Sequence, residues 1–214
     1  DLNIVYEDEN IILIDKPYGL IVHSDINEEF NTLINQVKAY LFNKGEYIPE
    51  NENSFVPALC NRIDRNTGGI VIVAKNAASL RILNQKIKDK EIRKFYLCLI
   101  YGHMKNKNGE IKSYLLKDEE KNQITAFSNP VKSAKTAITR YKVIEERENC
   151  SLIEAELETG RTHQIRAQFA SLGHPLIGDG KYGTNEINKQ FNRYTQALYS
   201  YKVIFAFTTP SEEL

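Results

Sequence analysis

The sequence predicts a mixed α+β fold with a mainly antiparallel sheet and flanking helices. Of the 214 residues 42% are hydrophobic, enough for one large core or two small ones. Short segments that alternate apolar and polar residues, as strands do, are interspersed with segments of helical period. Tight strand-helix-strand repeats, which indicate a parallel sheet, are few. We expect one domain over residues 1–214.

The first part of the chain predicts a hairpin and a helix. Residues 3–6 and 11–15 are expected to be short extended segments. They precede the KPYG turn at residues 16–19, where proline fixes one backbone angle and glycine supplies a left-handed one. Asn31 or Thr32 can cap a helix that runs to about residue 43, because its apolar residues recur at helical spacing.

A polar loop over residues 43–54 separates this part from the next. The β-branched run at residues 70–74 follows two glycines and predicts a buried strand. Asn76 then opens a helix to about residue 88, with Leu80, Leu83 and Ile87 on one face. Residues 94–101 predict another strand, whose alternation puts Lys94 and Tyr96 on the same side.

The second half predicts more sheet and one further helix. Charged, hairpin-like residues 103–130 are expected to form a mobile periphery. Residues 136–145 and 152–158 alternate apolar and polar, which favours an antiparallel pair that is solvated on one face. The segment 159–175 turns to helical period, with Ile165, Phe169 and Leu172 on one stripe, and its end is marked by Gly173 and Pro175. A strand at residues 202–207 closes the chain.

The net charge of zero conceals an uneven distribution. Residues 1–60 carry 3 Lys and Arg against 11 Asp and Glu, whereas residues 61–149 carry 19 against 10. Residues 150–214 are close to neutral, with 6 against 7. A positive segment of this kind can bind phosphate backbones through a local patch, although lysine-rich turns are also common on ordinary surfaces.

Several classes of protein are disfavoured by composition. The longest unbroken apolar run, residues 95–101, is far shorter than the roughly 20 residues that a membrane span needs. The beginning of the chain has neither a basic start nor an apolar signal core. Three cysteines without a C-x-x-C pair suit a reducing cytoplasm, and four histidines show no metal-binding spacing. We therefore expect a cytoplasmic protein without a structural or catalytic metal.

Asp64 stands out within NRIDRNTGGIVIVAKN, residues 61–76, because it lies between Arg62 and Arg65 on a loop that leads into a buried strand. If these arginines point towards Asp64, they hold its carboxylate ionised. If they point away, they can meet a polyanion. In both cases a carboxylate with catalytic potential sits in positive surroundings.

A second group of polar residues lies in GRTHQIR, residues 160–166, where a strand meets a helix. Free backbone N–H groups beside Arg161 and Arg166 suit a phosphate, but a structural ion pair is equally compatible with the pattern. Arg166, one turn inside the helix, is better placed to reach a buried acid. Tyr96 could stack on a base, although a tyrosine on a buried strand more often belongs to the core.

The segment NRIDRNTGGIVIVAK resembles the H-R-L-D-x-x-T-S-G-L signature of the RluA-like pseudouridine synthases. Further stretches resemble this family in the same order along the chain: KPYGLIVH at 16–23, the strand with Lys94 and Tyr96, TGRTHQIRAQFASLGHPLIGDGKYG at 159–183, and ALYSYKVIF at 197–205. The combination is highly specific and spans nearly the whole chain. It implies a single pseudouridine synthase catalytic domain, without the N-terminal S4-type RNA-binding module of many relatives.

The resemblance implies an isomerase that converts uridines of structured ribosomal or transfer RNA to pseudouridine, as a monomer and without metal or organic cofactor. Asp64 matches the essential carboxylate, acting either as nucleophile or as base. Tyr96 matches the tyrosine that stacks on the uracil and can accept a proton, and Arg166 the arginine that pairs with Asp64. Arg62 matches the residue that fills the gap of the flipped base. Further RNA contacts are implied for Arg65, Thr67, Arg161 and Leu198.

The chain departs from the family pattern at four places: Asn61 for His, Gly68 for Ser, Gln168 for His, and Tyr199–Ser200 for His–Ala. None is an expected catalytic group. A catalytically weak RNA-binding or RNA-folding factor on the same fold is the alternative, which the intact set of Asp64, Tyr96 and Arg166 disfavours. A glycosidase using Asp64 with Glu154 or Glu156 lacks a defined pair of carboxylates.

Overall fold

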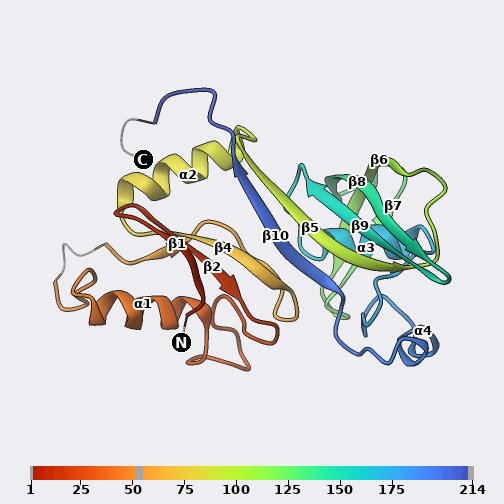
Figure 1. The fold of residues 1–214 in the computed structure, drawn as a ribbon, viewed down its shortest axis with the longest axis horizontal. Coiled ribbons are helices and arrows are strands. Elements are labelled where there is room, and N and C mark those ends of the chain that lie inside the picture. Colours follow the sequence, from red (N-terminus) through yellow and green to blue (C-terminus); the bar gives the residue numbers. More distant parts are fainter. Residues whose placement is uncertain (1, 52–54, 212–214) are drawn as a thin grey trace. The chain divides into compact units, whose positions relative to one another are not determined.

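The structure, a computed structural model, describes residues 2–51 and 55–211. The chain forms two compact units (Figure 1), the first from Asp1–Arg93 and Lys202–Leu214 and the second from Lys94–Tyr201. Strands β5 (Ile92–Tyr101) and β10 (Leu198–Phe205) each have residues in both units. The mixed, mainly antiparallel α+β class is confirmed, while the single catalytic domain stays a prediction.

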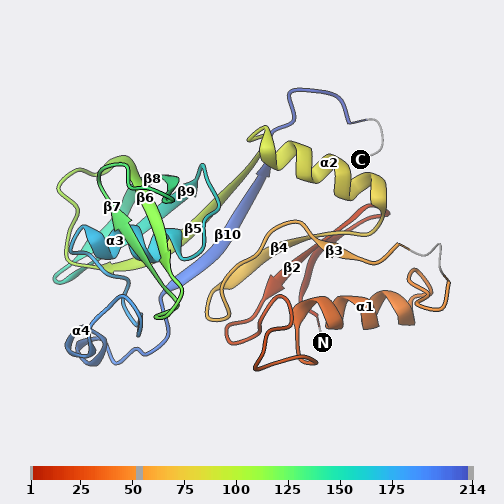
Figure 2. The same cartoon turned by 180° about the vertical axis from the view of Figure 1, so that it is seen from behind.

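The sheet of the first unit begins with the expected hairpin. Strands β1 (Ile4–Glu7) and β2 (Ile11–Lys16) pair antiparallel, and β2 pairs antiparallel with β4 (Gly68–Ala74). The short β3 (Ala58–Leu59) runs along β4 (Figure 2). β4 starts two residues earlier than expected, because Gly69 still pairs with Lys16 at the end of β2. The strand that follows the Asp64 loop is thus paired with β2 from Gly69 to Ala74.

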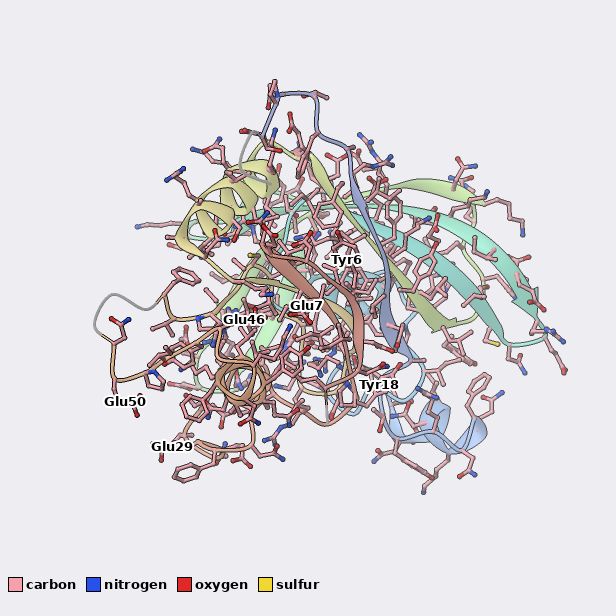
Figure 3. The ribbon with its side chains drawn as sticks, turned by 60° about the vertical axis from the view of Figure 1, so that its left-hand side comes forward. Tyr6, Glu7, Tyr18, Glu29, Glu46 and Glu50 are labelled. Atoms are coloured by element: carbon pink, nitrogen blue, oxygen red, sulfur yellow. The ribbon has the colours of Figure 1, made fainter. Side chains whose placement is uncertain are left out.

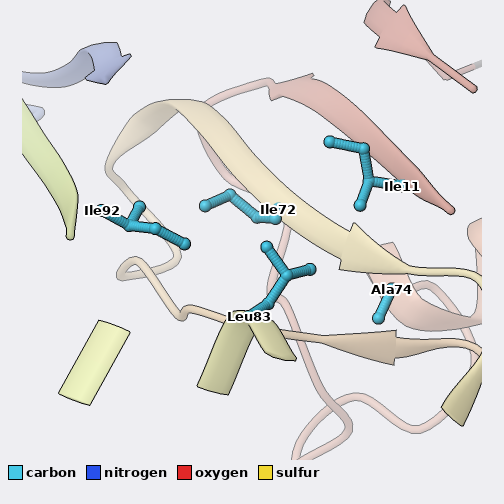
Figure 4. Close-up of a cluster of buried hydrophobic side chains, with 5 residues drawn as sticks. All are labelled: Ile11, Ile72, Ala74, Leu83 and Ile92. Carbon is cyan, nitrogen blue, oxygen red and sulfur yellow. The ribbon is translucent and has the colours of Figure 1, made fainter. Parts of the chain in front are cut away.

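Two capped helices complete the first unit. The helix α1 (Leu33–Asn43) is capped by Thr32 rather than Asn31, with the Thr32 side chain accepting from the backbone of Asn35. The helix α2 (Ala77–Lys88) begins at Asn76 with a reciprocal capping box, as expected. Leu83 of α2 points towards Ile72 of β4 (Figure 4), in a buried cluster with Ile11, Ala74 and Ile92. This packing fixes β4 from one side.

A network of charges ties the opening hairpin to the end of α1. Glu7 and Glu46 lie next to each other (Figure 3) and share two lysines, Lys44 and Lys75, at distances of 2.6 to 3.0 Å. Burial of Glu7 is outweighed by hydrogen bonds from Lys44, Tyr40 and Lys75, which lower the pKa of Glu7 to about 2. Some of the acidic residues among the first 60 thus form ion pairs within the first unit.

The second unit is an antiparallel sheet in the order β5, β9, β8, β6, β7. The new strands are β6 (Asn108–Asp118), β7 (Gln123–Phe127), β8 (Lys135–Arg147) and β9 (Cys150–Leu157). The predicted pair of β8 and β9 is confirmed. Residues 103–130 contain the expected hairpin of β6 and β7, which lies at one end of the sheet with β7 as its outer strand. β6 is paired on both sides, with β8 and with β7. The expected mobility of these residues stays a prediction.

Two helices belong to the second unit, of which only the first was expected. The helix α3 (Gln164–Ser171) packs through Ala167 against Leu115, Ile124 and Ala137 of the sheet. Leu172 lies beyond its end and is 47% exposed, so it is not part of the apolar stripe. The short helix α4 (Asn185–Gln190) is capped by Thr184. The closing strand β10 begins four residues before the predicted start and ends two before the predicted end, since its pairing extends beyond the apolar run.

Candidate active site

The loop that carries Asp64 is anchored by residues on both sides of Asp64. Asn61 is buried, and its side-chain oxygen accepts a hydrogen bond of 2.8 Å from the backbone of Ile72 in β4. Ile63 is buried as well. The backbone N–H of Thr67 closes a turn by donating to the carbonyl of Asp64 at 3.0 Å. Asp64 therefore sits half-buried on a fixed turn at the start of β4.

Lys16 is the main support of this loop, and the prediction from sequence treated it only as a turn residue. Its side chain is fully buried, and its Nζ donates to the carbonyls of Pro17, Leu20 and Arg65 at 2.9, 2.7 and 3.1 Å. Burial lowers the pKa of Lys16 to about 8, and the charge of Asp64 opposes this effect. Near neutral pH the ammonium group thus links the KPYG turn to the backbone next to Asp64.

Lys16→Met is expected to lower the free energy of unfolding by about 2–4 kcal/mol, because one buried and two part-buried carbonyls lose their donor. Urea unfolding followed by circular dichroism at pH 7 measures the loss. Lys88→Met is the control, since Lys88 lies exposed in the last turn of α2. A Lys16→Met protein as stable as the control would contradict this role.

The two arginines beside Asp64 are both exposed. Neither Arg62 nor Arg65 forms an ion pair with a carboxylate among the described residues. Burial together with the charges of Arg62 and Lys38 lowers the pKa of His23, so positive groups gather around the end of the KPYGLIVH stretch. This arrangement favours the reading in which the arginines meet a polyanion.

Tyr96 lies in β5 of the second unit, opposite Ala155 of β9. It is 5% exposed and shares its face of the strand with the buried residues Cys98 and Ile100. Its stacking on a base stays a prediction. Thr67 and Leu198, for which RNA contacts were predicted, are 1% and 5% exposed, and their contacts with RNA stay predictions.

Arg166 forms a bidentate ion pair with Asp179, a residue that the sequence prediction did not single out. Its Nε and Nη2 donate to the two carboxylate oxygens at 2.7 and 3.0 Å. The guanidinium also lies over the ring of Tyr182, 5.1 Å from the ring centre. Asp64 belongs to the first unit and Arg166 to the second, so their pairing stays a prediction.

The carboxylate of Asp179 is held by its own turn. It is fully buried, and one oxygen accepts from the backbone N–H groups of Lys181 and Tyr182. Gly178 has a φ of +81°, and a Cβ there would lie 2.2 Å from the carbonyl oxygen of Thr195. Only glycine fits this position. The backbone N–H of Gly178 donates to the side-chain oxygen of Asn188. The GHPLIGDG stretch thus serves to present Asp179 to Arg166.

The ion pair between Arg166 and Asp179 makes the free energy of unfolding depend on pH. Burial raises the pKa of Asp179, but hydrogen bonds and charge from Arg166 outweigh it, so the pKa lies below its ordinary value of 3.8. A carboxyl group with a depressed pKa contributes fully above the unfolded value and loses its contribution as pH falls through the folded value. Urea unfolding between pH 6 and pH 2 is expected to show this loss of stability below pH 3.8. The variant Asp179→Asn is expected to lack the part of the loss that comes from protonation of Asp179. Identical pH profiles for the two proteins would contradict it.

The start of α3 is fixed by a buried polar network. His163 has a left-handed backbone conformation, with φ of 52°, and its Nδ1 is 2.8 Å from the hydroxyl of Tyr182. Gln164 accepts from the Arg161 backbone and donates to the Ile138 carbonyl. Gln168 is bonded to Thr139, Ser113 and the backbone of β6 and β8. These contacts orient the helix that carries Arg166.

Within residues 2–51 and 55–211, no group of three or more His, Cys, Asp or Glu side chains is arranged to hold a metal ion. The helices in this part of the chain are also too short or too polar to span a membrane.

Comparisons with known proteins agree on one family. A family model described as RNA pseudouridylate synthase matches residues 10–171. The ribosomal large subunit pseudouridine synthase D of Borreliella burgdorferi is 34% identical over 200 residues, which are 94% of this chain and 60% of that protein. The ribosomal large subunit pseudouridine synthase C of Vibrio parahaemolyticus is 34% identical over 195 residues, 91% of this chain and 56% of that protein. The chain thus spans less than two thirds of either relative.

A solved structure shows the same fold. Human RNA pseudouridylate synthase domain containing 1 superposes with a TM-score of 0.75 at 22% identity, covering 98% of this chain and 80% of that one.

Proposed function

Because the chain belongs to the RNA pseudouridylate synthase family, in its RluA-like branch, we propose that it isomerises specific uridines of ribosomal or transfer RNA to pseudouridine. The observation that carries the proposal is the Asp64 loop. A half-buried carboxylate stands there between two exposed arginines, on a turn anchored by Lys16 and Asn61. Ribosomal RNA is the first candidate, since two relatives are named for the large ribosomal subunit.

In this proposal Asp64 either attacks C1′ of the ribose or removes its C2′ proton. The bond between C1′ and N1 of uracil breaks and the detached base rotates. C5 then bonds to C1′ as the bond from Asp64 to C1′ breaks or as the C2′ proton returns. The C5 proton leaves to a base, for which Tyr96 is the candidate, and N1 takes up a proton, so that no proton is gained or lost overall. Substrate and product have the same atoms, so the reaction consumes no oxidant, reductant or group donor, and we propose that it needs no cofactor or metal.

Three further residues have roles in the proposal. Arg62, exposed two residues before Asp64, occupies the gap in the RNA stack that the flipped base leaves. Stacking of the uracil on Tyr96 returns about 1–3 kcal/mol of the cost of extrusion. Arg166 keeps Asp64 ionised, and its guanidinium is already oriented by Asp179 and Tyr182. Arg65, Thr67, Arg161 and Leu198 contact RNA. We further propose that the protein acts as a monomer in the cytoplasm.

The test is tritium release from ribosomal RNA transcripts that carry 5-tritiated uridine, combined with carbodiimide mapping of pseudouridine. Release by the purified protein, and new pseudouridine at defined positions, support the proposal. Transfer RNA transcripts in a parallel reaction decide which class of RNA is used. Tight RNA binding without release or new pseudouridine would instead favour a binding or folding factor.

A further inference from the structure

Lys94 lies two residues before Tyr96 in β5 and is not used by the proposed chemistry. In the sheet register Lys94 is opposite Leu157 and Tyr96 is opposite Ala155. Side chains two apart in a strand point to the same face, so Lys94 and Tyr96 share one face of the sheet, roughly 7 Å apart along the strand. Tyr96 is buried there, whereas Lys94 is half-buried.

The ammonium group of Lys94 lies beside the loop that leads into α3. A Cβ placed on Gly160 would be 3.8 Å from Nζ of Lys94. Gly160 and the following Arg161 are both exposed. The Lys94 charge is therefore close to backbone that a ligand from solution can reach.

Nothing in the described part of the chain pairs with this charge. Glu158, at the near end of β9, bonds to Arg140 at 2.7 Å. Glu154 and Glu156 alternate with Ala155 and so lie on the opposite face of the sheet. Burial lowers the pKa of Lys94, and no carboxylate offsets that effect. A half-buried cation without a counter-ion costs stability, so the position suits a ligand that brings negative charge.

Arg161 supplies a second positive group next to Gly160. Its Nε donates to the Thr136 carbonyl at 3.1 Å, which anchors the side chain. Its Nη atoms have no hydrogen bond or ion pair within the described residues. An anchored guanidinium with free outer donors is well suited to phosphate oxygens.

We propose that Lys94 and Arg161 bind a backbone phosphate of the RNA, next to the nucleotide whose base Tyr96 receives. The inference rests on the proposed function and assigns Lys94 to positioning rather than to chemistry. Phosphate contacts fix the register of a nucleic acid on a protein, while base contacts select the sequence. One strand would thus hold both the base, at Tyr96, and the backbone, at Lys94.

The test compares Lys94→Met and Lys94→Arg with Lys142→Met in the full chain. Lys142 is an exposed lysine of β8 on the opposite face of the same sheet, since its neighbour Tyr141 is opposite Ala155. Lys94→Met is expected to raise KM for the RNA about tenfold, with kcat within about twofold. It is also expected to reduce the slope of log Kd against log salt by about one, as the loss of one phosphate contact does. Lys94→Arg should restore most of the binding.

Melting temperature separates this role from a structural one. A lysine without a partner inside the protein can be replaced by Met with an unchanged or higher melting temperature, whereas a structural lysine cannot. Unchanged KM and salt slope in Lys94→Met, with active wild-type protein, would overturn the phosphate site. A wild-type protein that binds RNA but releases no tritium would refute the proposed function, and the salt slope would still decide on Lys94.

Discussion

Asp64→Asn is expected to lower tritium release from 5-tritiated RNA by roughly 10³-fold or more, while RNA binding stays at least as tight. An amide has the shape of the carboxylate but is neither an anionic nucleophile nor a base at neutral pH. The turn itself should persist, because the Thr67 N–H donates to the backbone carbonyl of Asp64 and not to its side chain. Single-turnover release with enzyme in excess over RNA gives the chemical rate directly.

Asp89→Asn is the matched control, since Asp89 is an exposed carboxylate at the end of α2 in the same unit. It should release tritium at the wild-type rate. Residual release by Asp64→Asn within tenfold of wild type would remove Asp64 from the chemistry. In that case the proposed RNA contacts of Arg62 and Arg65 would be tested only by measurements of RNA affinity.

The largest effect on stability is expected from Asp179→Asn, at about 3–5 kcal/mol. The new side-chain oxygen can still accept from the backbone N–H groups of Lys181 and Tyr182. Its NH₂ group, however, would replace the oxygen that accepts from Nε of Arg166, and this guanidinium is 6% exposed and offers only donors. The variant thus leaves a buried charge without its counter-ion. Urea unfolding at pH 7 measures the effect.

Asp118→Asn serves as the control for this experiment, because Asp118 forms an exposed ion pair with Lys121 at 3.9 Å. Its other contact, a hydrogen bond of 3.0 Å from the backbone N–H of Lys121, can also be accepted by the oxygen of an asparagine side chain. Such a pair contributes at most about 1 kcal/mol. Arg166→Met combined with Asp179→Asn should cost less than the sum of the single changes, since the double variant carries no unpaired charge. Additive costs, or a cost below 1 kcal/mol for Asp179→Asn alone, would show that the pair does not support the second unit.

Local patterns predicted the elements that depend on local physics. Asn76 was recognised as the start of α2 because capping is decided within one turn of helix. The hairpin of β1 and β2 followed from alternation and turn residues. The position of β6 between β8 and β7 could not be predicted in this way, because it depends on pairing with β8, which lies further along the chain. Extended pairing also explains why β4 and β10 begin earlier than their apolar runs.

Motifs in the sequence single out Asp64, Tyr96 and Arg166 as candidate site residues, and their catalytic roles stay predictions. Lys16 and Asp179 lie inside the same motifs, but the sequence assigns them no role. The role of Lys16 depends on three carbonyls, one of them at Arg65, far away in the sequence. The role of Asp179 depends on a turn that only Gly178 can form. Both residues act through backbone geometry, which the identity of a residue does not reveal.

The chain leaves the first unit once, in β5, and returns to it once, in β10. The second unit is therefore one uninterrupted stretch of sequence, inserted into the first unit between Arg93 and Lys202. Asp64 lies in the first unit, whereas Tyr96, Lys94 and Arg161 lie in the inserted stretch. The proposed reaction therefore draws on residues from both units. A deletion that joins residue 93 to residue 202 would remove all the proposed site residues of the second unit at once and would keep Asp64, Arg62 and Lys16 in the first.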